Sequence, residues 1–120
     1  MSGIPQNPNE VVLHLAELSR QLDETTKQLN QADVDAVNAR ETAKLAEAKA
    51  FLAAEGPVDH RKAKAVEQTH EERLAAEVAE AMVRGLQRTS RTLQTRIDVG
   101  RTFSATVRSE ISLAGYGGGA

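Results

Sequence analysis

Glu67 and His70 form a Glu-x-x-His motif, in which a carboxylate and an imidazole are three residues apart. On a helix both side chains then point the same way, and bundles that hold two iron ions use two such motifs with two further glutamates. A dimer could supply the second motif, with Glu41 or Glu47 as an added ligand. The adjoining positions are alanines, not carboxylates, so we expect His70 to be a seam or boundary residue and no metal or cofactor to bind. A metal-binding bundle stays as an alternative.

The C-terminal half carries six arginines in a stretch whose only acidic residue is Asp98. These candidate binding residues are Arg84, Arg88, Arg91, Arg96, Arg101 and Arg108. A nucleic-acid surface would require them to converge. At 100° per residue the first three share one helix face, Arg101 and Arg108 a second, and Arg96 a third. From Arg84 to Arg101 there is no aromatic residue to stack on bases. We therefore expect solvated arginines that are partly matched by acids elsewhere in the chain.

Other arrangements that support catalysis are missing from the sequence. There is no cysteine, and His14 and His60 have no partners at ligand spacing. No nucleophile elbow, phosphate-binding loop or Cys/His cluster is present. We predict a protein that is not an enzyme.

The composition indicates which elements must position these residues. The chain has 120 residues, with two Phe, one Tyr and no Trp, and much of its apolar content is alanine. Alanine buries little apolar surface, so elongated helices that meet along seams are favoured over a spherical core. No run of 18 apolar residues occurs, and the start "MSGIPQNPNE" lacks signal-peptide features. We expect a cytoplasmic protein without membrane contact.

A first helix is predicted over residues 8–55, after an N-terminal extension of residues 1–7. Asn7 is suited to cap it, with Pro8 in its first turn and Glu10 as the third helical residue. Apolar or small residues then recur at alternating steps of four and three from Val11 to residue 53, as in a coiled coil. The dipeptide Gly56-Pro57 should end this helix.

A hinge at 56–60 should lead into a second helix over 61–114, with a bend near Gly85 or Gly100. Residues 103–113 also alternate as a strand would, but no second strand exists for pairing, so we favour the helix. Gly115 should stop the helix and leave residues 115–120 as a flexible glycine-rich tail.

The two helices are predicted to pair as a long antiparallel coiled-coil hairpin, because a short hinge joins two long amphipathic helices. Residues whose numbers sum to about 116 should meet. The apolar pairs are Leu29 with Leu86, Leu22 with Leu93, Leu18 with Ile97, and Leu15 with Gly100. Glu17 should then lie near Arg101, and Glu10 near Arg108.

Such a hairpin leaves apolar surface uncovered, which predicts self-association into a helical bundle. The uncovered set includes Val12, Val34, Val37, Leu45, Leu52 and Met82. The residues assigned to self-association are Leu15, Leu18, Leu22, Leu29, Leu86, Leu93 and Ile97.

The segment "QTRIDVGRTFSATVRSE", together with the Ala/Glu-rich helix before it and "KAKA" after a Gly-Pro hinge, resembles small helical proteins encoded by phages of actinobacteria. Proteins of this kind generally have no assigned function, and some are encoded near recombination or replication genes. The resemblance implies a role in DNA metabolism for some members. The chain is also similar to secreted helical hairpins of the WXG type in size and central hinge, but it has no Trp and carries "EGPVD" at the turn.

Charge is divided unevenly along the chain, which has a net charge of −2. Residues 1–60 contain five Lys/Arg and ten Asp/Glu, whereas residues 61–120 contain ten and seven. The sequence therefore predicts a helical interaction protein that binds a protein partner through its basic C-terminal half. A nucleic-acid accessory protein is the alternative.

Overall fold

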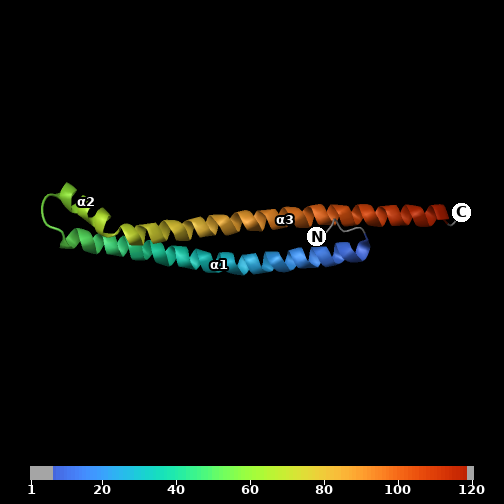
Figure 1. Ribbon diagram of the computed structural model, residues 1–120, viewed down its shortest axis with the longest axis horizontal. Helices are drawn as coiled ribbons and strands as arrows, with labels where there is room; N and C mark the ends of the chain where they lie inside the picture. The colour runs from blue at the N-terminus through green and yellow to red at the C-terminus, as the bar shows by residue number, and fades with distance from the viewer. Residues whose placement is uncertain (1–6, 119–120) are drawn as a thin grey trace. The chain divides into compact units, whose positions relative to one another are not determined.

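A computed structural model of the chain describes residues 7–118, with side chains up to Gly115. These residues form three helices and no strand: α1 (Pro8–Ala53), α2 (Val58–Gln68) and α3 (His70–Gly118) (Figure 1). The prediction of an all-α helical hairpin is confirmed. The strand alternative for residues 103–113 is excluded, because this segment lies within α3.

Helix α1 begins as its capping pattern predicted. The Asn7 side-chain oxygen Oδ1 accepts a hydrogen bond of 2.9 Å from the backbone N–H of Glu10, and the Asn7 carbonyl accepts one of 3.1 Å from Val11. The helix ends at Ala53, two residues before the predicted boundary. Gly56 then adopts a φ of +106°, which a residue with a Cβ rarely adopts, and Pro57 precedes α2.

The prediction of one continuous second helix over 61–114 is wrong. Helix α2 starts earlier, at Val58, and a break at Thr69 separates it from α3. Neither Gly85 nor Gly100 interrupts α3. The helix also continues past Gly115 to Gly118, so the predicted stop at residue 115 is wrong as well. Residues 1–6 of the predicted extension and 119–120 of the predicted tail lie outside the described residues.

The chain leaves helical geometry at Thr69, where φ is −111° and ψ is 21°. The Thr69 hydroxyl donates to the Ala65 carbonyl at 2.7 Å, and its own N–H donates to the same oxygen at 3.2 Å. The same hydroxyl bond at Thr26, Thr102 and Thr106 leaves their helices unbroken. The backbone bond from His70 to Val66 that would continue the helix is not formed in the described chain. Instead, an Arg73 guanidinium nitrogen, Nη2, donates to the Val66 carbonyl at 2.6 Å.

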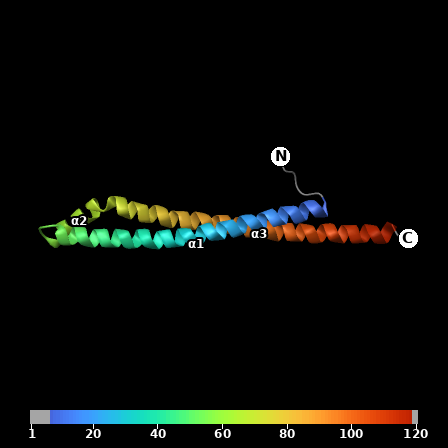
Figure 2. The same ribbon diagram turned by 90° about the horizontal axis from the view of Figure 1, so that it is seen from below.

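The chain divides into two units, which are described separately. In its described part, unit 1 comprises residues 7–26 and 88–118. Leu18, Leu93 and Ile97 form its buried cluster, and Leu22 packs against them. Segments of α1 and α3 that are far apart in the sequence therefore lie side by side (Figure 2). The predicted pairings of Leu22 with Leu93 and Leu18 with Ile97 are in accord with this cluster.

Gly100 provides the closest approach in unit 1. A Cβ built at this position would lie 2.6 Å from the Cδ2 atom of Leu15. The absence of a side chain at Gly100 thus makes room for Leu15, which is the contact that the register predicted.

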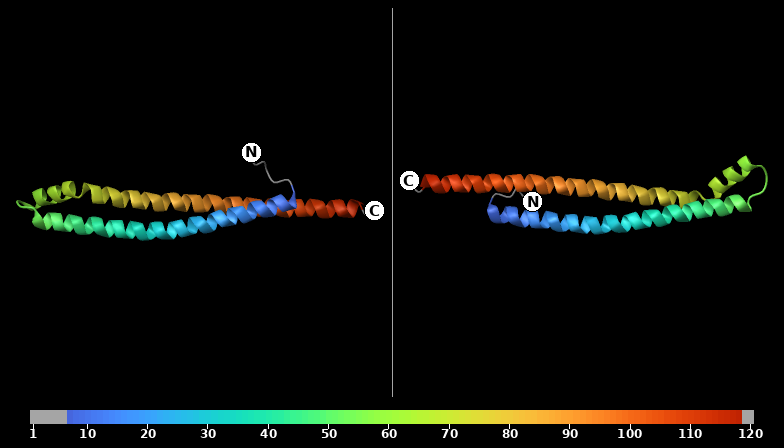
Figure 3. Two further views of the ribbon diagram at one scale, coloured as in Figure 1. Left: turned by 60° about the horizontal axis from the view of Figure 1, so that its bottom comes forward. Right: turned by 180° about the vertical axis from the view of Figure 1, so that it is seen from behind.

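Unit 2 comprises residues 27–87 and contains the turn with α2 (Figure 3). Its core consists of small side chains, because the buried apolar residues are all alanines. They are Ala32, Ala36, Ala43, Ala65 and Ala76. Arg40 of α1 and Glu80 of α3 form an ion pair of 3.4 Å across this seam. Both side chains are more than one third exposed, so the pair contributes little stability.

Candidate functional site

Three of the six predicted arginines surround a shallow depression of about 530 Å³ in unit 1. Arg88, Arg91 and Arg96 line it together with Thr92 and Thr95, all from α3. We refer to these five residues as the arginine–threonine face. Assigning Arg96 to a separate helix face was wrong, because its long side chain reaches the same depression.

The shape of this face follows from side-chain length and helical spacing. Thr92 and Thr95 are short, whereas the arginines beside them on the helix surface are long, so the threonines form the floor and the guanidinium groups the rim. The buried residue Ile97 lies about 180° around the helix from Arg88. The face is therefore directed away from the seam of unit 1.

The polar groups of this face are not used within the described chain. Thr26, Thr102 and Thr106 each donate a hydrogen bond to the carbonyl four residues before them. Thr92 and Thr95 form no such bond in residues 7–118, and no ion pair there involves Arg88, Arg91 or Arg96. The arrangement offers hydroxyl and guanidinium donors without a carboxylate among them, which suits an anion.

The other three arginines lie elsewhere. Arg84 belongs to unit 2, where it is exposed. Arg101 lies 4.0 Å from Asp98, one turn away on the same helix, and Arg108 is exposed. The structure does not bring the six together into one site.

Glu17 was expected to lie near Arg101, but the ion pair that it forms is with a different arginine. The Glu17 carboxylate instead accepts hydrogen bonds from Arg20 at 2.6 and 3.0 Å and from Gln21 at 3.1 Å. The hydrogen bonds from Arg20, followed by that from Gln21, lower the pKa of Glu17 from 4.5 to about 2. The charges on this part of α1 are thus paired along the helix.

The residues that were predicted to mediate self-association are all at least partly covered within the chain. They are buried or half-buried: Leu15, Leu18, Leu22, Leu29, Leu86, Leu93 and Ile97. Leu18, for example, is 3% exposed. Their role in self-association stays a prediction.

An exposed apolar surface lies on the outside of α1 in unit 2. The residues Val34, Val37, Leu45 and Leu52 are 47–75% exposed, and we call them the outer apolar stripe. Val12 and Met82, which were also expected to stay uncovered, are 62% and 57% exposed. The sequence thus predicted correctly which side chains the hairpin leaves uncovered.

The Glu-x-x-His motif is not a metal site in this arrangement. Glu67 lies in α2 and His70 in α3, and the break at Thr69 between them abolishes the shared helix face. Both side chains are exposed. Residues 7–118 contain no group of three or more His, Asp or Glu side chains that could hold a metal ion.

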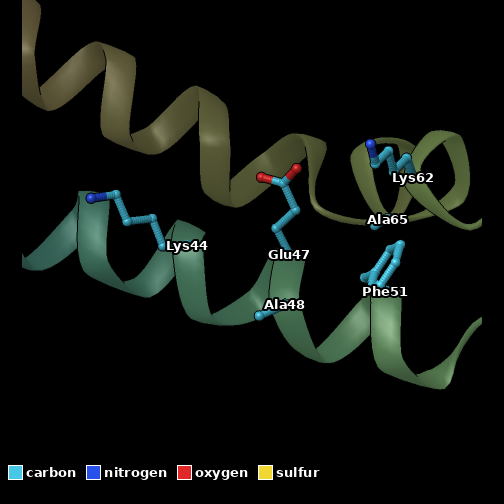
Figure 4. A pocket seen from close by; sticks show the side chains of 6 residues that line it. All are labelled: Lys44, Glu47, Ala48, Phe51, Lys62 and Ala65. Atoms are coloured by element: carbon cyan, nitrogen blue, oxygen red, sulfur yellow. The ribbon is translucent and has the colours of Figure 1, made fainter. Parts of the chain in front are cut away.

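A second hollow, of about 370 Å³, separates α2 from the end of α1 in unit 2 (Figure 4). The Phe51 ring points toward Ala65, and Glu47 and Lys62 also line the hollow. Arg61 lies 4.4 Å from the centre of the Phe51 ring and donates to the Phe51 carbonyl at 3.3 and 3.4 Å. These contacts hold α2 against α1. These contacts were not predicted, although the sequence places an arginine ten residues after a phenylalanine across a Gly-Pro turn.

Comparisons with known proteins do not identify the chain: no family model, curated protein or solved structure matches it. The resemblance to helical phage proteins therefore stays a prediction. No helix within residues 7–118 is both long and apolar enough to cross a membrane.

Proposed function

We propose that this chain is a non-enzymatic helical interaction protein whose partner is a second copy of itself. The observation that carries this proposal is the exposure of the outer apolar stripe. Leu45 and Leu52 are 57% and 75% exposed on a helix whose opposite side already packs on α3. A helix with two apolar sides is characteristic of a bundle with more than two helices.

The spacing of the stripe supports a helical partner. Val34, Val37, Leu45 and Leu52 are separated by 3, 8 and 7 residues, close to whole turns. Leu45 lies about 180° around α1 from the buried Ala36. The stripe therefore forms a narrow line along α1, which fits the side of another helix.

The charges beside the stripe favour an antiparallel copy as that helix. Asp33 and Asp35 lie at its N-terminal end and Lys49 lies toward its C-terminal end, whereas Lys44, near its middle, pairs with Glu41 at 3.7 Å. Two copies related by a twofold axis would bring the acidic end of one stripe beside the basic end of the other. Such an isologous contact closes on itself and yields a dimer.

Light scattering coupled to size-exclusion chromatography tests this proposal. Wild-type protein should be a dimer that dissociates on dilution, and Leu45→Glu with Leu52→Glu should be a monomer, because the dimer interface would have to bury four glutamates. Circular dichroism should show the same helix content, since glutamate is a good helix former.

A double variant of Leu13→Glu and Leu113→Glu is the matched control. These leucines are 70% and 69% exposed and lie outside the stripe, in unit 1. The control should remain a dimer although it introduces the same charge. A monomeric wild type at high concentration, or equal dissociation of both variants, would contradict the proposal.

A further inference from the structure

We infer that the arginine–threonine face binds the phosphate backbone of duplex nucleic acid without regard to base sequence. This face belongs to unit 1 and shares no residue with the outer apolar stripe. The inference is thus independent of the proposed self-association, and either can fail alone.

The chemistry of the face selects an anion with several oxygens. Arg88, Arg91 and Arg96 present guanidinium donors around the hydroxyls of Thr92 and Thr95. From residue 81 to residue 97 the sequence contains no acidic residue. Phosphate oxygens accept hydrogen bonds from guanidinium groups and hydroxyls, and both donor types are common at nucleic-acid backbones.

The length of the face indicates a chain of phosphates rather than a single one. Arg88 and Arg96 are about 12 Å apart along the helix axis, which exceeds the extent of one phosphate group. The depression is also shallow and on an exposed side of α3, where a single small anion would be poorly enclosed. A polymer of phosphates compensates for this poor enclosure by making several contacts at once.

The lack of aromatic side chains on the face favours a duplex over a single strand. Contacts limited to phosphate favour binding that does not depend on base sequence. No aromatic residue lies on the face to stack on the bases of a single strand. Contacts to phosphate alone carry no direct information about base identity. We therefore expect two unrelated duplexes to bind equally well, and a single strand of the same length to bind less tightly.

Fluorescence anisotropy with a labelled short DNA duplex at low salt provides the test. Arg88→Gln with Arg91→Gln should weaken binding about tenfold. The negative slope of log affinity against log salt should become shallower by about two. Adding Arg96→Gln should make the slope shallower by about three in total.

Arg101→Gln with Arg108→Gln is the matched control, because it removes the same charge from the same helix outside the face. Its affinity should stay within about twofold of wild type, and its salt slope should not change. Equal losses in both double variants would overturn the assignment to this face. No duplex binding at low salt would overturn the proposal, as would equally tight binding of poly-glutamate, since an acidic polypeptide would then be as good a ligand.

Discussion

At the scale of single residues, charge pairing in this chain is mostly local. Three of the four ion pairs in the described residues join side chains three positions apart on one helix. The Glu17–Arg20 pair has the shortest contact, 2.6 Å. The register had suggested pairs between helices instead. A neighbour one turn away on the same helix is always within reach, whereas two exposed side chains on different helices must both be extended and ordered to meet.

The low pKa of Glu17 leads to a prediction about acid stability. Because the hydrogen bonds from Arg20 lower this pKa from 4.5 to about 2, the ionised form stabilises the folded chain at pH values above the unfolded pKa. This contribution should be lost as the pH falls from about 4.5 to about 2. Urea unfolding across this range should show a steeper loss of stability for wild type than for Glu17→Gln.

The Arg20→Gln background is the control for this prediction, because it removes the hydrogen bonds that contribute most to the shift. In that background, Glu17→Gln should change the pH dependence less, since only the hydrogen bond from Gln21 remains. The effect should be small, since both side chains are exposed. A carboxyl of Glu17 that titrates near 4.5 by NMR in the wild type would contradict the prediction.

At the scale of elements, the break between α2 and α3 is the main departure from the expected pattern. It occurs at a threonine with helical residues on both sides, and not at a glycine or proline. Thr69 is 3% exposed, and its hydroxyl donates to the Ala65 carbonyl. Arg73 then supplies the donor for the Val66 carbonyl that the break leaves without a backbone partner.

Replacing Arg73 by Met should loosen α2. The change keeps most of the side-chain stem but removes the guanidinium that bonds to the Val66 carbonyl. Because Val66 is 41% exposed, water can replace part of this bond, and we expect a loss of about 1 kcal/mol. Amide hydrogen exchange should accelerate in residues 58–68.

Arg108→Met, at an exposed position of α3 in unit 1, should leave the exchange of α2 unchanged. Unchanged exchange in α2 of the Arg73 variant would show that the contacts of Arg61 with Phe51 suffice to hold this helix.

At the scale of the whole molecule, stability is spread along the seams and not concentrated in one core. Unit 1 packs leucine and isoleucine side chains, whereas unit 2 packs alanines. No residue with a large side chain is below 2% exposed in the described part of the chain. A helix pair of this kind responds to a change mainly where the change occurs, because each layer contacts only its neighbours.

A leucine deletion in unit 1 tests this local response. Leu18→Ala should destabilise unit 1 by about 2–3 kcal/mol, because Leu18 is 3% exposed in the buried cluster. Hydrogen exchange should rise in residues 7–26 and 88–118 more than in residues 27–87. Leu13→Ala, at a side chain that is 70% exposed, should change neither unit. Equal acceleration in both units would indicate a single cooperative unit instead.

The sequence predicted the structure correctly wherever the spacing of apolar residues was compatible with only one arrangement of helices. The steps of four and three along residues 11–53, with the Gly56-Pro57 turn, were enough to predict a helical hairpin. Matching large residues to large ones then predicted the contact of Leu15 with Gly100. The predicted ends at residues 55 and 114 were wrong. Helix α1 ends at Ala53, and α3 continues past Gly115 because a glycine is compatible with helix as well as with a stop.

The sequence by itself therefore determined the helical hairpin, the register of unit 1 and the side chains left uncovered, because all three follow from the spacing of apolar residues along a helix. Only the tertiary structure decided which side chains share a surface. The grouping of Arg96 with Arg88 and Arg91 depends on the reach of long side chains over short ones. The separation of Glu67 from His70 depends on the break at Thr69, which the pattern of residue types did not predict.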